Sequence, residues 1–182
     1  MPQSLSVLWT FVWGVIITID ALNKQTEFVT KIISEKADYC LALKANQNLT
    51  YEPVRGVFEP GNHEYKIALP SVTDQSGKIV KRKTRVLPGN LVPKEILNKW
   101  IGLGKGSIVE AVTDTLKKNN GEILEPQVRY YISSLRYDAP NVEQAQQRAI
   151  RQHWALEMAF NQDRLQCTNT QYLAGRTLLN KI

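Results

Sequence analysis

The sequence predicts an α/β protein that begins with a strand–helix–strand unit, continues into a region rich in antiparallel strands, and ends in helices. Three observations support this fold class. A short run of β-branched residues precedes an amphipathic segment near the start of the chain. Alternating apolar and polar runs recur between Pro60 and Pro126. A long segment with helical character follows Asn141.

The first unit opens with residues 14–19, which read GVIITI, and a continuous apolar run of this length is typical of a central strand. Residues 26–37 have apolar side chains at helical spacing, and residues 39–43 return to strand character. A strand, a helix and a strand within about 30 residues predict a parallel pair joined by a crossover. Asp20 is therefore expected at the carboxyl end of a strand, the edge of an open α/β sheet where ligands bind.

The middle of the chain is punctuated by Gly and Pro and carries short alternating runs. Three of these runs predict strands of an antiparallel sheet: residues 63–69, 79–87 and 107–116. Asn120-Gly121 predicts a hairpin turn, and residues 129–135 (RYYISSL) predict one more strand. A helix is expected from Asn141 to about residue 163, and a second short helix at residues 170–179.

Composition places the chain among ordinary globular proteins. The 182 residues fit one domain, and a hydrophobic fraction of 43% with 22% charged residues argues against disorder and coiled-coil arrays. The formal net charge of +6 mildly favours a polyanionic partner. Two isolated cysteines, Cys40 and Cys167, indicate reduced thiols in a cytoplasmic protein. The apolar stretch at 6–19 is shorter than the roughly 20 residues of a membrane helix, so no membrane partner is expected.

The densest basic cluster begins just before the strand predicted at 79–87 and contains five cationic side chains: Lys78, Lys81, Arg82, Lys83 and Arg85. On a strand or hairpin, such a cluster presents positive charge to a phosphate backbone. The alternative is a solvated hairpin that happens to be basic, and composition alone does not separate the two.

A second group lies on the predicted C-terminal helix, where residues three and four apart share a face: Arg148, Arg151, His153, Trp154 and Glu157. A carboxylate beside guanidinium groups suits a metal ion with bound phosphate, although His–Glu pairs at this spacing are more often ordinary surface contacts. Asp20 has two interpretations as well, because an Asp after a strand often caps the next helix. Its functional interpretation is a carboxylate ligand for a hard divalent cation.

Several blocks of sequence occur in the order found in one known family: GVIITIDALNKQTEFVTKII, DYCLALKANQ, WIGL, RYYISSL, IRQHWALE and FNQDR. From residue 14 to the C-terminus, the chain resembles the bacterial insertion-sequence transposases of the ISAs type, which include the H-repeat-associated proteins. The resemblance implies an RNase H-like core, incomplete here and interrupted by a β-rich insertion. Its implied divisions are an unmatched segment (1–13), a partial core (14–59), the insertion (60–127), and a core strand with the catalytic-helix region (128–182).

The family consists of DDE transposases, which cut and join DNA with a divalent metal held by three carboxylates. The resemblance matches the second Asp of this triad to Asp20. It matches the Glu to Glu157, because HWALE fits the family's HW-x-I-E pattern. Both residues are thereby expected to be catalytic and to bind Mg²⁺ or Mn²⁺.

The resemblance also implies double-stranded DNA at the element ends as the partner. Lys44, Asn46 and Gln47 match the family's LALKxNQ block near the active edge, and Arg151 and His153 match helix residues expected to contact DNA phosphates. With the basic cluster, the expected DNA-binding set is Lys44, Asn46, Gln47, Lys81, Arg82, Lys83, Arg148, Arg151 and His153.

Three departures from the family pattern lead us to expect an inactive, N-terminally truncated fragment. Only 13 residues precede Gly14, with no equivalent of the first catalytic Asp, and those residues resemble nothing in the family. The family's second HW, which follows its catalytic Glu, is also missing. Glu157 is therefore either the catalytic Glu or a substitute for the Asp of a downstream LDV block.

Two alternatives to an enzyme remain open. The first is a non-catalytic DNA-binding remnant, with a second copy or a full-length transposase as its candidate protein partner, which it would inhibit. The second is a poorly folding gene relic.

Overall fold

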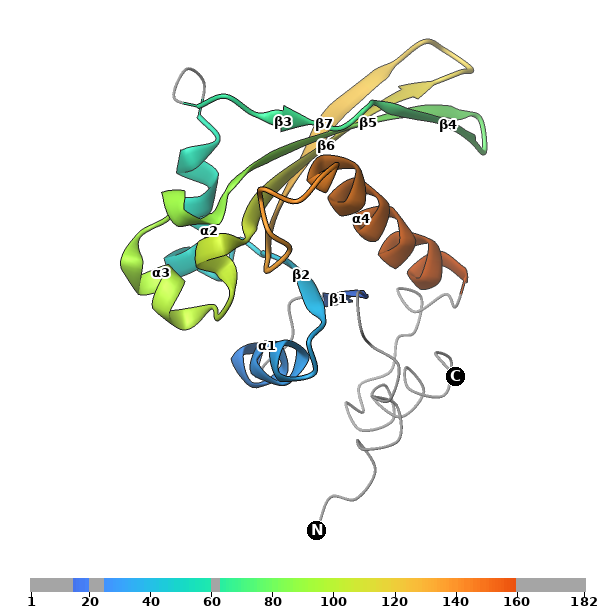
Figure 1. The fold of residues 1–182 in the computed structure, drawn as a ribbon. Coiled ribbons are helices and arrows are strands. Elements are labelled where there is room, and N and C mark those ends of the chain that lie inside the picture. The colour runs from blue at the N-terminus through green and yellow to red at the C-terminus, as the bar shows by residue number, and fades with distance from the viewer. Residues whose placement is uncertain (1–14, 20–24, 60–62, 160–182) are drawn as a thin grey trace.

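The computed structural model describes residues 15–19, 25–59 and 63–159, which form a mixed α/β structure with one seven-stranded sheet and four α-helices (Figure 1). The strands are β1 (Ile16–Ile19), β2 (Asp38–Ala42), β3 (Lys66–Ile67), β4 (Ser71–Gln75), β5 (Lys78–Pro88), β6 (Ser107–Lys117) and β7 (Ile123–Ser133). The helices are α1 (Gln25–Ser34), α2 (Asn48–Val57), α3 (Lys94–Lys99) and α4 (Val142–Ala159). None of the helices in these ranges is long and apolar enough to cross a bilayer.

The predicted strand–helix–strand unit is confirmed. Strands β1 and β2 pair in parallel, with Ile17 opposite Tyr39, and α1 lies between them in the chain. Helix α1 buries Val29 and Ile32, one turn apart, against the sheet because these positions share a helical face. The helix ends at Ser34, earlier than expected, and Lys36 takes a left-handed conformation in the turn that leads to β2.

The middle of the chain and the first unit share one continuous sheet, whose order is β1-β2-β7-β6-β5-β3, with β4 also paired to β5. The predicted strand at 129–135 is part of β7, which runs antiparallel to both β2 and β6. The expected division between residues 127 and 128 therefore falls inside one strand. Helices α2 and α3 were not predicted from the sequence.

Helices cover both faces of the sheet, so that two apolar clusters form. Helices α1, α2 and α3 pack on one face, around buried residues that include Trp100, Leu103 and Ile132. Helix α4 packs on the opposite face, where its Val142 and Ile150 join Cys40, Val86 and Val109. Successive side chains along each strand point to these two faces in alternation. We call them the α1 side and the α4 side of the sheet.

Burial in the α4-side cluster raises the pKa of the Cys40 thiol to about 12. Because the thiolate is the reactive form, Cys40 should resist thiol reagents at neutral and mildly alkaline pH and react fully in concentrated guanidinium chloride. A Cys167→Ser variant, in which Cys40 is the one remaining thiol, isolates this signal for a colorimetric assay. Unfolded protein ionises first, since its thiol pKa is near 9, so stability should fall as the pH rises from 9 towards 12. Rapid labelling of the folded variant would contradict this placement.

A hydrogen-bond network fixes α4 on the sheet. The buried Gln146 side chain donates to Ser107 Oγ (3.1 Å), and Ser107 Oγ donates in turn to the Leu135 carbonyl (2.7 Å). The neighbouring Ser133 Oγ donates to the Tyr39 carbonyl (2.6 Å). The start of β6, the end of β7 and β2 are thus joined to the first half of α4, which sets the helix direction across the sheet.

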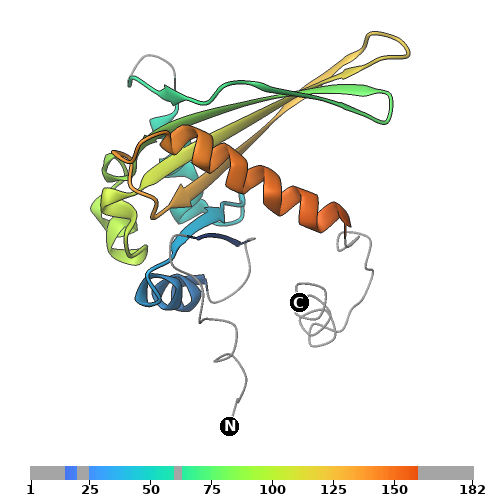
Figure 2. The ribbon, with the colours of Figure 1, turned by 45° about the vertical axis from the view of Figure 1, so that its right-hand side comes forward.

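Two hairpins extend beyond the helices, as Figures 1 and 2 show, and we call residues 71–83 and 111–129 the arm. Residues 107–110 of β6 are buried, whereas those from Ala111 to Lys117 are half-buried. In β7, the residues before Tyr130 are mostly exposed and those after it are buried. The arm is therefore an antiparallel sheet that offers much of its surface to solvent.

Candidate functional site

The expected catalytic residues lie at the margins of the described ranges. Strand β1 ends at Ile19, and Asp20 lies outside these ranges. Glu157 belongs to α4 by its backbone, but its side chain lies outside what the structure describes, as does that of His153.

The backbone elements that carry these residues do come together. Helix α4 contacts β1 and β2 as well as β5, and Ile16 of β1 packs against the cluster that contains Ile150 of α4. Thr18 pairs with Cys40, another member of that cluster, so Ile16 and Thr18 share the α4 side of the sheet. Helix α4 therefore packs over the face of β1 to which Ile16 and Thr18 point.

Within residues 15–19, 25–59 and 63–159, no group of three or more His, Cys, Asp or Glu side chains is placed to hold a metal ion. Any metal site built on Asp20 and Glu157 thus depends on atoms beyond those ranges.

Lys44, Asn46 and Gln47 lie in the turn between β2 and α2. Gln47 closes this turn, because its side-chain oxygen accepts from the Lys44 amide (3.2 Å) and its own amide donates to the Lys44 carbonyl (2.8 Å). Since β1 and β2 run in parallel, this turn follows β2 at the same sheet edge at which β1 ends. Lys44 and Asn46 are exposed there.

The basic cluster of β5 is divided between the two sides of the sheet. Val86 belongs to the α4-side cluster and Leu87 to the α1-side cluster. Because successive side chains of a strand point to opposite faces, even-numbered residues of β5 lie on the α4 side and odd-numbered residues on the α1 side. The α4 side receives Lys78 and Arg82. The α1 side receives Lys81, Lys83 and Arg85.

The cations on the α1 side have carboxylate neighbours. Arg85 forms an ion pair with Glu110, which is 4% exposed, and its guanidinium lies 4.6 Å from the centre of the Tyr65 ring. Lys83 lies 4.0 Å from Asp114. Arg82, by contrast, donates to the Thr73 hydroxyl (2.9 Å) on the α4 side.

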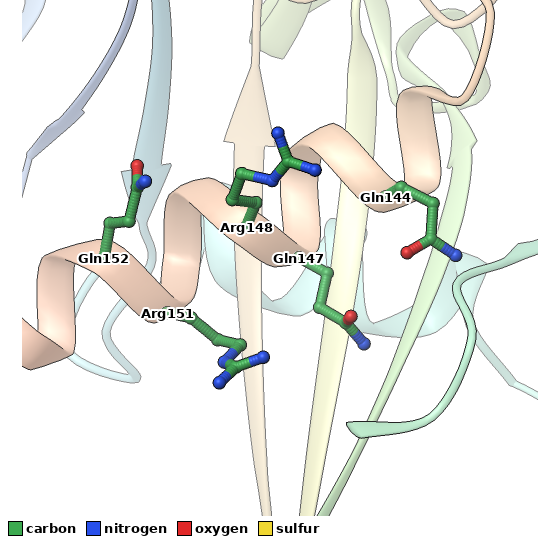
Figure 3. A pocket seen from close by; sticks show the side chains of 5 residues that line it. All are labelled: Gln144, Gln147, Arg148, Arg151 and Gln152. Carbon is green, nitrogen blue, oxygen red and sulfur yellow. The ribbon is translucent and has the colours of Figure 1, made fainter. Parts of the chain in front are cut away.

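Helix α4 carries a hollow of about 350 Å³ lined by five residues, which Figure 3 shows: Gln144, Gln147, Arg148, Arg151 and Gln152. The first four lie at i, i+3, i+4 and i+7, one face of a helix. Gln147 donates to the Leu69 carbonyl (3.2 Å), which ties this face to the segment before β4. Arg151 lies close enough to Arg82 that, after burial, its charge is the second cause of the lowered pKa of Arg82.

The structure thus brings Arg82, Arg148 and Arg151 to one side of the molecule and leaves Lys81 and Lys83 on the other. Sequence reasoning did not single out the three glutamines of the hollow, although their helical spacing with the arginines was a readable signal. It also missed Arg129, which pairs with Ala111 on the α4 side of the arm.

Comparison with curated proteins finds relatives. The chain is 32% identical to "Putative transposase YncI" of Escherichia coli O157:H7 over 149 residues, which cover 80% of this chain and 36% of the relative. It is 30% identical to "H repeat-associated putative transposase YhhI" of Escherichia coli K12 and 28% identical to "Putative protein YbfL" of the same strain, over 166 residues in each case. These cover 86% of this chain and 40% of each relative. No protein-family profile and no solved structure matches the chain.

Proposed function

Because two curated homologues, at 32% and 30% identity, are named putative transposases, we propose that this chain acts in DNA transposition, with double-stranded DNA as its partner. The chain spans 36–40% of the length of these relatives, so the activity of a whole transposase is part of the proposal. The homology is the observation that carries the proposal. The basic surface shared by β5 and α4 supports the choice of partner, since nucleic-acid backbones are bound by clustered Lys and Arg.

We further propose that Asp20 and Glu157 face one another across the α4 side of an RNase H-like core. Continuing the alternation of Ile16 and Thr18 by two residues predicts the α4 side for Asp20. The contact of α4 with β1 supports an approach of Glu157 from the same side. Carboxylate oxygens are the ligands that Mg²⁺ and Mn²⁺ prefer, so these two residues are the proposed metal ligands.

We expect the 182-residue chain to produce no specific nick when it is incubated with Mg²⁺ or Mn²⁺ and element-end DNA. In-line phosphoryl transfer on two metal ions needs a fuller set of ligands than the two carboxylates proposed here. The products are resolved on a denaturing gel, with a Glu157→Gln variant as the matched control. Specific nicks by the parent chain that the variant lacks would show that the chain is catalytic by itself.

A second candidate function is DNA binding without catalysis, which would let the chain join and inhibit a full-length transposase. It is favoured by the basic surface that Arg82 of β5 forms with Arg148 and Arg151 of α4. Gel retardation with the Asp20→Ala variant separates the candidates. Retardation that survives the substitution and weakens with salt supports binding without catalysis, whereas absence of retardation for the parent chain would reject DNA as the partner.

A further inference from the structure

The arm has two chemically different sides, and the pairing registers determine which residue lies on which. On the α4 side, Lys78 pairs with Lys117, Arg82 with Thr113, and Ala111 with Arg129. On the α1 side, Ile79 pairs with Leu116 and with Asp74, and Lys81 pairs with Asp114. Cross-strand partners project to the same face, so these pairs describe the composition of each side.

Carboxylates at paired positions of strands β3 to β7 all lie on the α1 side, where they are Asp74, Glu110 and Asp114. The paired positions on the α4 side of the arm hold cations, hydroxyls, amides and the apolar residues Val80, Ala111 and Leu124, but no carboxylate. The exception near this surface is Glu122, which follows the hairpin turn and forms an ion pair with Lys117 (2.9 Å). Away from that tip, no carboxylate occupies a paired position on the α4 side of the described arm, whereas Lys78 and Arg82 do.

Helix α4 extends this basic side. All five residues that line its hollow carry N–H donors, and none of them is a carboxylate. Arg148 and Arg151 are exposed, and Gln147, which is buried, already uses one donor on the Leu69 carbonyl. A hollow with such a lining suits an anionic oxygen-rich group better than a cation or an apolar ligand.

Arg82 lies on the face of β5 that α4 covers, and α4, which carries Arg151, contacts β5. The charge of Arg151 adds to burial in lowering the pKa of Arg82, so the pair repels in the absence of an anion. Arg82 is held in place by the Thr73 hydroxyl, on the neighbouring strand. A phosphate oxygen between the two groups would turn their repulsion into two charge-assisted hydrogen bonds.

We propose that a nucleic-acid phosphate backbone runs along the α4 side of the arm and into the hollow of α4, with Arg82 and Arg151 holding one phosphate between them. This inference rests on the proposed DNA partner and adds which face of the arm binds it. It removes Lys81 and Lys83 from the expected DNA-binding set, because they lie on the face with the carboxylates.

The test compares two double variants that each lose two positive charges: Arg82→Gln/Arg151→Gln and Lys81→Gln/Lys83→Gln. Binding of a short fluorescent DNA duplex is measured by anisotropy over a series of salt concentrations, after thermal melting has shown that each variant folds. The arginine variant should bind about tenfold more weakly at low salt, and its salt slope should fall by about 0.9 for each phosphate that it no longer binds. The lysine variant should keep the slope of the parent chain.

The outcomes distinguish failure of the assigned binding face from failure of the proposed DNA partner. No binding by the parent chain rejects both. Binding that both variants retain, or that both lose equally, rejects the assigned face while the DNA partner stands. Arg148→Gln, an exposed helix position outside the sheet, provides a second measurement if the arginine double variant does not fold, and an unchanged slope in that variant also rejects the inference.

Discussion

Replacing Gly106 by alanine is expected to destabilise the protein by about 3 kcal/mol, the upper part of the range for overpacking a buried site. A Cβ atom at this position would lie 2.1 Å from the Ser133 carbonyl oxygen and 3.0 Å from the Ser134 Cα, both of them backbone atoms. The backbone there has no free volume to yield, because Ser133 is fully buried and paired with Ser107. Relief of the clash must therefore separate the start of β6 from the end of β7.

Gly104, two residues earlier in the same short turn, provides the matched control. A Cβ atom there meets nothing within 4 Å, so Gly104→Ala should change stability by less than about 0.5 kcal/mol. Both variants are compared by urea unfolding, in which a shift of midpoint at constant slope reports stability. Equal midpoints for the two variants would show that β6 and β7 do not approach as closely at Gly106 as the structure has them.

Removal of the Arg85 charge is expected to cost about 3–5 kcal/mol, because it leaves a buried carboxylate without its partner. Glu110 is 4% exposed, and the Arg85 guanidinium binds it directly across strands β5 and β6. Arg85→Leu keeps an apolar stem against Tyr65 but leaves the Glu110 charge unpaired. The double variant Arg85→Leu/Glu110→Leu should recover most of the loss, because apolar pairs replace buried ion pairs at little cost.

Lys83 and Asp114 offer the contrasting pair on the same two strands. They are 4.0 Å apart and both reach solvent, so Lys83→Leu should change the free energy of unfolding by less than about 1 kcal/mol. Urea unfolding of the parent chain and these three variants completes the comparison. If Arg85→Leu is as mild as Lys83→Leu, Glu110 is not held as a buried charge.

The first structural unit was predictable because two independent signals agree there. The β-branched run IITI and the helical spacing of Val29 and Ile32 indicate different element types in the order that a parallel pair requires. The structure has that pair, with α1 shortened at its end. Local pattern and packing give the same result, which is the condition under which sequence reasoning succeeds.

Helix α2 was not predicted because its sequence contains residues that disfavour a helix. Pro53 and Gly56 lie inside it, and both disfavour a helix interior. Its stability comes from tertiary contacts instead, since Val54 and the adjoining Phe58 are buried in the α1-side cluster. The apolar residues of α2 do recur at helical spacing, but Pro53 and Gly56 obscure that signal in a segment of only ten residues.

The candidate site shows a different limit. Five cations within eight residues suggested one patch, but a strand sends neighbouring side chains to opposite faces. Arg82 consequently lies with Arg151, which is 69 positions later in the chain, rather than with Lys81 and Lys83 beside it. The proposed roles of Asp20 and Glu157 remain predictions, because their side chains lie outside the described ranges.

The irregularity between Thr113 and Thr115 controls which chemistry reaches each side of the arm. Between these pairs, β7 has one residue more than β6, which is a β-bulge. Beyond the bulge, Thr115 pairs with Leu124 and Leu116 with Ile123. An uninterrupted ladder from Thr113–Gln127 would instead have set Glu125 opposite Thr115, among the cations. One additional residue thus shifts the phase of the hairpin and keeps an acid out of register with the surface that faces α4.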